Sequence, residues 1–170
     1  MVLKKINALV ALLSAIMLVD HTVACGILMM LDRINESEAV PAYILMGLVG
    51  VHAVISMLMI TVFHDGSSTK YGELYRATIL QRVSGILMLI PIMGHILISD
   101  KNGIAYGVLH ILLVVLSLLH TSVSVPNALV TMGVVKSMKS HKVAFIISAV
   151  ISAVVTIIGI TGGIMMFIRM

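Results

Sequence analysis

The sequence has 170 residues, of which 60% are hydrophobic and 11% are charged, and its mean hydropathy is +1.17. This composition excludes a soluble protein, because so few polar residues cannot cover a water-facing surface. The formal net charge of +4 does not indicate nucleic acid as a partner, since the chain lacks a polar face on which basic residues could gather. We therefore expect an all-α integral membrane protein.

Five apolar segments are each long enough to cross a bilayer as a helix. A ~30 Å hydrocarbon core needs about 20 residues of helix, whereas a membrane barrel would show short alternating segments. The segments run from Ile6 to Leu31, Tyr43 to Phe63, Thr78 to Ile98, Ile104 to about Val125, and Val143 to Ile168. Pro126 is expected to kink the fourth segment, which either ends near Val125 or runs on as a cytoplasmic extension to Lys136. Five crossings place the two termini on opposite sides of the membrane.

The basic residues predict the orientation of these crossings. Lys4, Lys5, Lys70, Arg76, Arg82, Lys136, Lys139 and Lys142 lie at the amino end, in the second loop or in the fourth loop, whereas Arg33, Lys101 and Arg169 fall on the other side. The positive-inside rule then places the N-terminus in the cytoplasm and the C-terminus outside, in the cytoplasmic membrane. The first segment imitates a signal peptide that ends before Cys25, but Asp20 and His21 interrupt its apolar run, so we expect the segment to be retained.

Four histidines lie inside four successive apolar segments. These are His21, His52, His95 and His120, one in each of the first four segments. An ionisable side chain within a bilayer is usually functional, because a charged one costs about 2.5 kcal/mol or more. One such histidine alone would suggest a hydrogen-bonded core residue, but four in successive helices favour ligation of a metal or of haem iron.

The depth of each histidine sorts the four into two pairs. At 1.5 Å per residue, His95 lies roughly 8 Å and His21 roughly 16 Å from the outer ends of their segments, whereas His52 and His120 lie centrally or inward. We therefore predict two haems stacked across the membrane, an outer one ligated by His21 and His95 and an inner one ligated by His52 and His120. Because the sequence contains no CxxCH motif, both would be haem b. Two imidazole ligands make low-spin iron, which suits electron transfer rather than oxygen binding.

The third segment carries residues for both haems. Ser84 lies eleven residues before His95, which puts it within about 20° of the same helix face and roughly 16 Å nearer the cytoplasm. We expect Ser84 and Gly85 to line the wall of the inner haem, while Gln81 and Arg82 bind its propionates. An anchor at the cytoplasmic membrane surface is the alternative role for Arg82.

The run from Leu80 to His95, LQRVSGILMLIPIMGH, resembles the third helix of the dihaem cytochrome b subunits of succinate:quinone and quinol:fumarate reductases. In that family the segment is QR[VT][ST]G followed by a histidine. The sequences around His52 and His120, the five-helix count and the ligand-free fifth segment are also similar to the five-helix, single-anchor type. The resemblance implies one transmembrane cytochrome b domain over residues 1–170, in which the first four helices form a haem-binding bundle with the ligand pairs given above.

The resemblance also implies partners that this chain does not contain. A flavoprotein with covalent FAD would interconvert succinate and fumarate, and a subunit with iron–sulfur clusters would join it on the cytoplasmic side. Electrons would pass between these subunits and a membrane quinone or quinol near the outer haem, while the chain anchors the complex in the lipid bilayer. Menaquinone or ubiquinone, either reaction direction and a higher oligomer of the complex all stay open.

Quinone chemistry takes up or releases protons, so a titratable group is expected near the outer haem. The candidates are Asp20, Asp32, Glu36, Glu38 and His110. Ordinary outward-facing charge is the alternative for the three loop acids, and a bond to a haem propionate or a helix contact is the alternative for His110. The carboxyl of Asp20 could accept a hydrogen bond, stay protonated or line a proton path.

Two other functions fit the same histidines. The chain could be the dihaem anchor of a hydrogenase, of a formate dehydrogenase or of a reductase of another unsaturated acid, which would share the haem spectrum but not copurify with succinate or fumarate activity. A small metal or proton transporter that uses the histidines as a relay would lack the cytochrome spectrum altogether.

Overall fold

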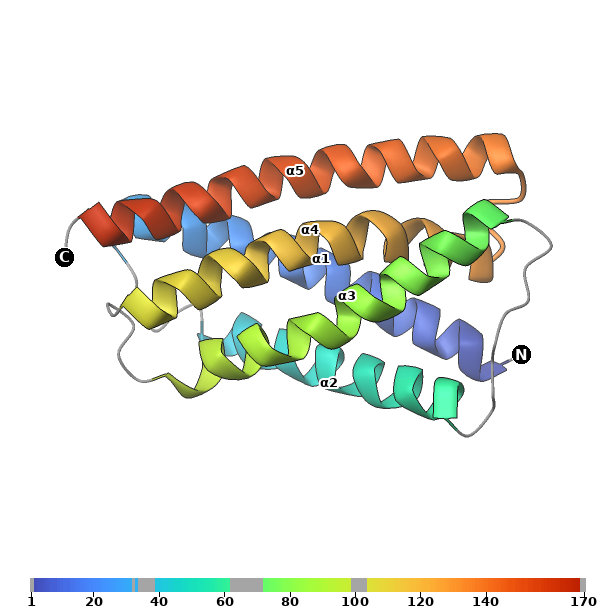
Figure 1. The fold of residues 1–170 in the computed structure, drawn as a ribbon, viewed down its shortest axis with the longest axis horizontal. Coiled ribbons are helices and arrows are strands. Elements are labelled where there is room, and N and C mark those ends of the chain that lie inside the picture. The colour runs from blue at the N-terminus through green and yellow to red at the C-terminus, as the bar shows by residue number, and fades with distance from the viewer. Residues whose placement is uncertain (1, 32, 34–38, 62–71, 99–103, 169–170) are drawn as a thin grey trace.

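In the computed structural model the chain folds into five long α-helices. They are α1 (Val2–Met30), α2 (Ala39–Thr61), α3 (Gly72–Leu97), α4 (Ile104–Thr131) and α5 (Met138–Ile168). The structure describes residues 2–31, 33, 39–61, 72–98 and 104–168. Each of the five helices is long and apolar enough to cross a membrane, which confirms the expected all-α, multi-pass architecture. α1 begins and α5 ends at opposite ends of the bundle (Figure 1), as an odd number of crossings requires.

Apolar side chains cover the outside of this bundle. The isoleucine side chains of Ile86, Ile90 and Ile157 are 61%, 71% and 64% exposed, and many other large aliphatic residues are exposed to a similar degree. In water such a continuous apolar surface would drive association, whereas lipid chains solvate it as well as another helix does. The exposed surface is therefore that of a protein within a bilayer.

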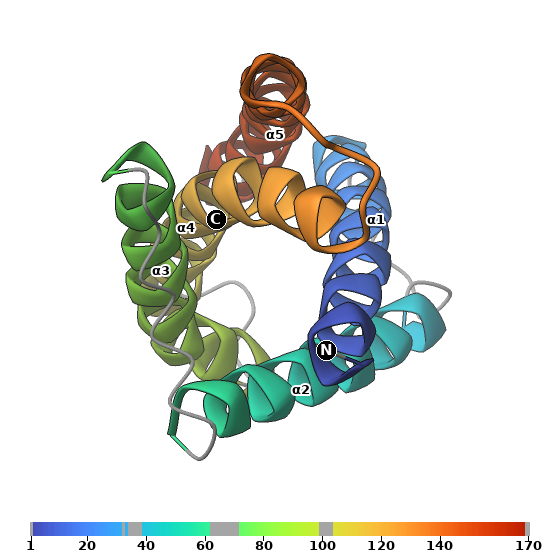
Figure 2. The same cartoon turned by 90° about the vertical axis from the view of Figure 1, so that its right-hand side faces the viewer.

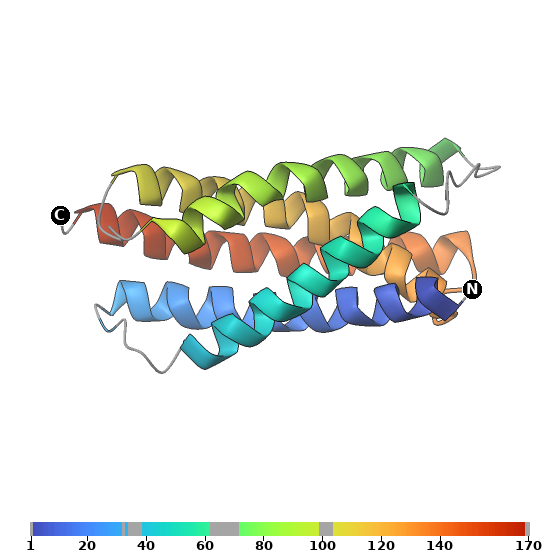
Figure 3. The same cartoon turned by 90° about the horizontal axis from the view of Figure 1, so that it is seen from below.

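The first four helices form a ring, and α5 lies outside it. Viewed along the bundle, α1, α2, α3 and α4 follow one another around a centre, with α5 beside α1 and α4 (Figure 2). α2 crosses α1 obliquely (Figure 3). Among the described residues, α2 packs against α1 alone and α3 packs against α4 alone. The side of the ring between α2 and α3 is thus not closed by direct helix packing. Across the centre, α1 faces α3 and α2 faces α4 (Figure 2).

Glycines bring α5 into backbone contact with α1. A Cβ atom added to Gly162 would lie 2.8 Å from the carbonyl oxygen and 2.9 Å from the Cα of Gly26. A Cβ added to Gly26 would in turn lie 3.0 Å from the carbonyl oxygen of Ile158. Helices in lipid gain their packing energy from such close approach of small residues. These contacts attach α5 to the ring without closing its centre.

The C-terminal end of α4 differs from the prediction. α4 continues through Pro126 and ends at Thr131, so the helix passes Val125 but stops short of Lys136. The predicted extension to Lys136 is therefore wrong. The helix stops because Gly133 adopts a φ of +79°, and the N–H groups of Gly133 and Val134 each donate to carbonyls of the last turn at 3.0 Å. This is a Schellman motif, which satisfies the last carbonyls and turns the chain away.

Replacing Gly133 with alanine is expected to destabilise the protein by about 1–2 kcal/mol, because a Cβ atom is disfavoured at positive φ. No heavy atom lies within 4 Å of the added Cβ, so the loss would come from the backbone and not from a clash. A lower midpoint of thermal unfolding in detergent would measure it. Gly47→Ala is the matched control, since it also meets open space but lies inside a helix, where alanine is favoured.

The first turns of α2, α3 and α5 reflect local sequence signals. α2 begins at Ala39, so Pro41 lies within its first turn, where helix N–H groups have no intrahelical acceptor in any case. α3 begins at Gly72, six residues before the predicted start at Thr78. At α5, the backbone N–H of Ser140 donates to Ser137 Oγ at 3.1 Å and the N–H of Ser137 donates back to Ser140 Oγ at 3.1 Å, a reciprocal cap. The predicted third loop, residues 99–103, lies outside the described residues.

The described basic residues gather at one end of the bundle. α1, α3 and α5 begin at this end and α4 finishes there (Figure 1). It carries Lys4, Lys5, Arg76, Arg82, Lys136, Lys139 and Lys142. Arg33 lies beyond the other end of α1, and Lys70, Lys101 and Arg169 lie outside the described residues. This asymmetry is what the positive-inside argument requires, and the assignment of this end to the cytoplasm stays a prediction.

Candidate functional site

The four intramembrane histidines meet as two pairs inside the ring. The ring centroids of His21 on α1 and His95 on α3 lie 6.4 Å apart, with an interplanar angle of 90°. Those of His52 on α2 and His120 on α4 also lie 6.4 Å apart, at 65°. Each pair joins two helices that face each other across the ring (Figure 2). The structure brings together the partners that the depth argument paired, while their role as ligands stays a prediction.

The two pairs occupy different levels of the bundle. Asn7 of α1 contacts His52, with 3.0 Å between Asn7 Oδ1 and His52 Nδ1. At 1.5 Å per residue, Asn7 lies roughly 21 Å along α1 from His21. The pair of His52 and His120 therefore lies toward the basic end, and the pair of His21 and His95 lies toward the other end.

The spacing within each pair is compatible with two ligands on one metal ion. A metal–imidazole bond is about 2.0–2.1 Å long and the bonded nitrogen lies about 1.1 Å from the ring centre, so two imidazoles on opposite sides of one ion have centroids about 6.3 Å apart. The described residues contain no group of three or more His, Cys, Asp or Glu side chains that could hold a metal ion. Haem iron needs only two protein ligands, because the porphyrin supplies four nitrogens. The donor set of each pair therefore fits haem iron.

Hydrogen bonds orient both imidazoles of the inner pair. His52 Nδ1 lies 3.0 Å from Asn7 Oδ1, and His120 Nδ1 lies 3.1 Å from the backbone carbonyl oxygen of Gln81. Both oxygens only accept, so each Nδ1 carries the proton and donates it. The unprotonated Nε2 of each ring is left as the ligand atom. Histidines that bind metals commonly have their other nitrogen fixed in this way.

Ser84 and Gly85 contact the ring of His120 itself. The Oγ of Ser84, a residue that is 2% exposed, lies 3.2 Å from His120 Nδ1. A Cβ atom at Gly85 would lie 3.1 Å from Cε1 of the same ring. The sequence predicts both residues at the wall of the inner haem, and that role stays a prediction. Their described contacts are with the ring of His120, a predicted ligand that they hold between α3 and α4.

A cavity of about 330 Å³ opens at the basic end, beside His52. All four ring helices line it, and its lining includes Lys4, Asn7, His52, Thr78, Gln81, Arg82, Ser124, Asn127 and Thr131. Gln81 and Arg82 thus lie where the sequence predicts groups for haem propionates. The side chain of Gln81 is turned toward α4, because its Oε1 accepts a hydrogen bond from Asn127 Nδ2 at 2.8 Å. Two cationic side chains, Lys4 and Arg82, give the cavity a lining suited to carboxylates.

Sequence reasoning missed Lys4, Asn7 and Asn127. Lys4 was interpreted only as a topology signal, and a single asparagine in an apolar helix was given no role. A usable signal did exist, because an amide inside a membrane helix is costly unless it is hydrogen bonded. Asn7 and Asn127 are the asparagines that fall within the apolar segments at this end, and both take part in hydrogen bonds near the inner pair.

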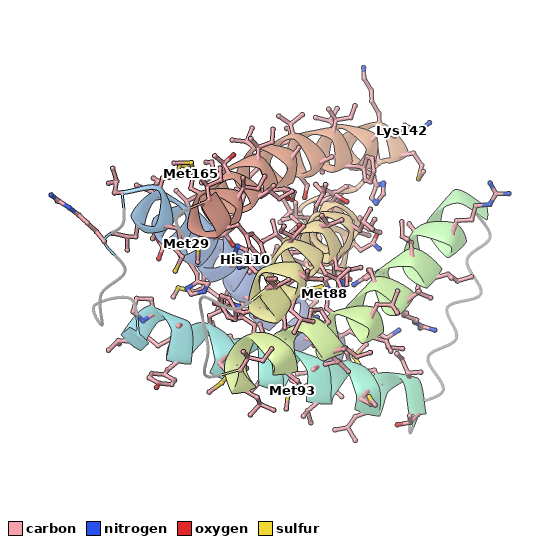
Figure 4. The ribbon with its side chains drawn as sticks, turned by 60° about the vertical axis from the view of Figure 1, so that its left-hand side comes forward. Met29, Met88, Met93, His110, Lys142 and Met165 are labelled. Carbon is pink, nitrogen blue, oxygen red and sulfur yellow. The ribbon has the colours of Figure 1, made fainter. Side chains whose placement is uncertain are left out.

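Two aromatic rings of α4 lie beside His95 of the outer pair. The ring of Tyr106 stacks on His95 with centroids 5.2 Å apart, and the ring of His110 lies 5.9 Å from His95. His110 is in the interior of the bundle (Figure 4) and is 7% exposed. Its Nε2 donates a hydrogen bond to the backbone carbonyl of Gly159 at 3.2 Å. His110 thus makes a contact between α4 and α5, which agrees with the alternative of a helix contact. On α1, Cys25 Sγ lies 3.6 Å from His21 Nδ1.

No described contact links an acidic candidate to His21 or His95. Asp20 on α1 is exposed, although it is adjacent in sequence to His21. Consecutive residues of a helix point about 100° apart, so the two side chains leave α1 in different directions. Asp32, Glu36 and Glu38 lie outside the described residues.

The fold and the site define this chain as a multi-pass helical membrane protein with paired histidines inside a four-helix ring. Comparisons of the chain with protein-family models, with curated proteins and with solved structures found no match.

Proposed function

We propose that this chain is the membrane anchor and dihaem electron-transfer subunit of a succinate:quinone oxidoreductase or quinol:fumarate reductase. The observation that carries the proposal is the pair of 6.4 Å imidazole spacings across the ring, one near each end of the bundle. A single pair would be consistent with a structural contact. The two pairs have equal spacing, and each joins helices that do not otherwise pack together. This arrangement favours two bound groups of the same kind, one between the histidines of each pair.

Each pair would bind one haem b, which supplies reversible one-electron transfer at a low-spin iron. The chain's own residues then have distinct tasks. Asn7 and the carbonyl of Gln81 accept hydrogen bonds from Nδ1 of the inner imidazoles, which leaves Nε2 of each as the ligand atom. Lys4 and Arg82 line the cavity at the basic end, where they can balance the charge of propionate groups.

The two ends of the bundle would serve different partners. The basic end would receive electrons from, or deliver them to, a cytoplasmic iron–sulfur subunit joined to a flavoprotein with FAD. The other end, near His21 and His95, would exchange electrons with membrane quinone or quinol. Moving one electron across a potential of 100 mV exchanges about 2.3 kcal/mol with the field, so a chain that spans the membrane couples the reaction to that field.

A pyridine haemochrome assay on the purified complex tests the proposal. The expected result is two b haems per chain, together with copurifying succinate or fumarate activity. Two haems without that activity would instead indicate the anchor of a hydrogenase, a formate dehydrogenase or another reductase. A complex with no haem would overturn the proposal and favour a metal or proton transporter.

Replacing Asn7 with leucine, which is similar in size but cannot accept a hydrogen bond, is expected to weaken binding of the inner haem. Loss of a partner that orients a ligating histidine typically costs about 10–100-fold in affinity. Transfer of haem from the purified variant to an excess of a haem-binding acceptor protein would measure the change. Ser56→Ala is the matched control. It removes a hydrogen bond to Asn7 and leaves the bond between Asn7 and His52 in place, so retention close to the parent protein is expected. Equal haem retention in both variants would contradict the role of Asn7.

A further inference from the structure

The fifth helix holds His110, while its own histidine, His141, lies in its first turn at the basic end. The backbone carbonyl of Gly159 accepts the hydrogen bond from His110 Nε2 at 3.2 Å. A Cβ atom at Gly163 would lie 3.0 Å from Cδ2 of the same ring, so the α5 backbone lies close to the Nε2–Cδ2 edge of the imidazole. His110 Nδ1 is buried and has no hydrogen-bond partner among the described residues. Packing and one hydrogen bond to α5 therefore fix this ring.

Tyr106 lies one helical turn before His110 and is buried beside it. Its side chain is 5% exposed, and its ring lies 6.3 Å from that of His110 at an angle of 22°. Next to it, a Cβ atom at Gly107 would overlap the ring of Phe167, so α5 packs directly on the α4 backbone here. Residues four apart lie on one side of a helix, and α5 thus contacts α4 at His110 and next to Tyr106.

The ring of His95 forms a cluster with these two residues, stacked on Tyr106 and tilted against His110. Its plane is tilted by 24° from Tyr106 and by 32° from His110, while it stands at 90° to His21. The described ring contacts of His95 on the α4 side are thus with two rings close to parallel with its own. The inner pair, at 65°, has its planes set by hydrogen bonds to Asn7 and Gln81.

We propose that Tyr106 and His110 are positioning residues, supported by α5, that hold the plane of His95 perpendicular to that of His21 and so tune the outer haem independently of the inner one. The inference rests on the proposed function, because it concerns the orientation of a haem ligand. It assigns a role to α5, which contributes no ligand. The relative orientation of two axial imidazoles sets the splitting of the iron d orbitals, and ligand orientation is one of the means by which a protein adjusts a haem.

Electron paramagnetic resonance of the oxidised complex tests this inference, because the low-field g value of low-spin iron increases as the two imidazole planes approach 90°. In the parent complex we expect two low-spin signals, and the signal that His95→Ala removes belongs to the outer haem. Tyr106→Leu removes the stacking surface, so the outer signal is expected to move to a lower g value and the outer midpoint potential to shift. Tyr106→Phe keeps the ring and should preserve both.

The inner haem is the internal control, since both of its readouts should stay unchanged in every Tyr106 variant and so show that the bundle is intact. Tyr43→Leu is a matched surface control, because Tyr43 is 68% exposed on α2. Gly163→Ala provides an independent test, as it pushes on His110 without changing α4 and should move the outer signal in the same direction. An outer signal that is unchanged in both Tyr106→Leu and Gly163→Ala would overturn the inference and leave the proposed function standing. Absence of haem from the parent complex would overturn both.

Discussion

Replacing His120 with alanine is expected to remove the inner haem and leave the outer haem bound, so that the haemochrome content of the complex falls by half. The reason is that His120 provides one of the two imidazoles of the inner pair, while the outer pair lies roughly 21 Å away along α1. His95→Ala should show the converse, with loss of the outer haem alone. Reduced-minus-oxidised spectra, together with the haemochrome assay, would measure both losses.

His141→Gln is the matched control for these two replacements. Its imidazole lies at the basic end, where Nε2 is 3.2 Å from Asn127 Oδ1, a contact that a glutamine amide can reproduce. This variant should retain both haems. The haem that stays in each single variant also shows that the bundle has folded. Retention of both haems in His120→Ala would mean that His120 is not an iron ligand, and His95→Ala would test the other pair independently.

Replacing Gly85 with valine is expected to remove the inner haem as completely as loss of His120 does. The first added atom would lie 3.1 Å from Cε1 and 3.4 Å from Nδ1 of His120, and the two further methyl groups of valine need more room than the ring leaves. The imidazole would be displaced from the Gln81 carbonyl and from its place opposite His52. Valine is no worse than glycine within a helix, so α3 itself should not be weakened.

Gly50→Val on α2 is the matched control. It separates the steric effect on His120 from any general effect of a β-branched residue in a helix. No heavy atom lies within 4 Å of an added Cβ at Gly50, so that variant should keep both haems. The measurement is again the haem content of the purified complex, with the outer-haem spectrum as the check on folding. A Gly85→Val complex that keeps both haems with an unchanged inner spectrum would show that His120 does not need its present position.

The agreement between the predicted and observed pairing has a simple physical origin. The rise of a helix is constant, so the distance of a histidine from the end of its apolar segment gives its depth in the bundle. Depth was enough to separate His21 and His95 from His52 and His120. The ring order of the helices, which puts each pair across the centre, could not be obtained in this way, because apolar surfaces all round each helix give no preferred neighbour.

Other parts of the site depend on contacts between residues far apart in the sequence. Asn7 is 45 residues from His52, and Gly159 is 49 residues from His110. No local pattern links such residues, since each contact is created by helix packing. The role of Gly85 was only partly predicted for the same reason. A small residue near a histidine helix indicates close approach, but it does not show whether a neighbouring ring or a bound group occupies the space.

The sequence by itself determined the membrane class, the five crossings, the charge asymmetry and the depth of each of the four paired histidines. These properties follow from composition and from the fixed rise of a helix, and they do not require knowledge of neighbours. Only the tertiary structure decided which imidazoles face each other, which nitrogen of each inner ring is held, and that α5 supports the stack beside His95. Those features depend on the rotation of each helix about its axis. Packing between small residues sets this rotation, and an almost uniformly apolar sequence does not reveal it.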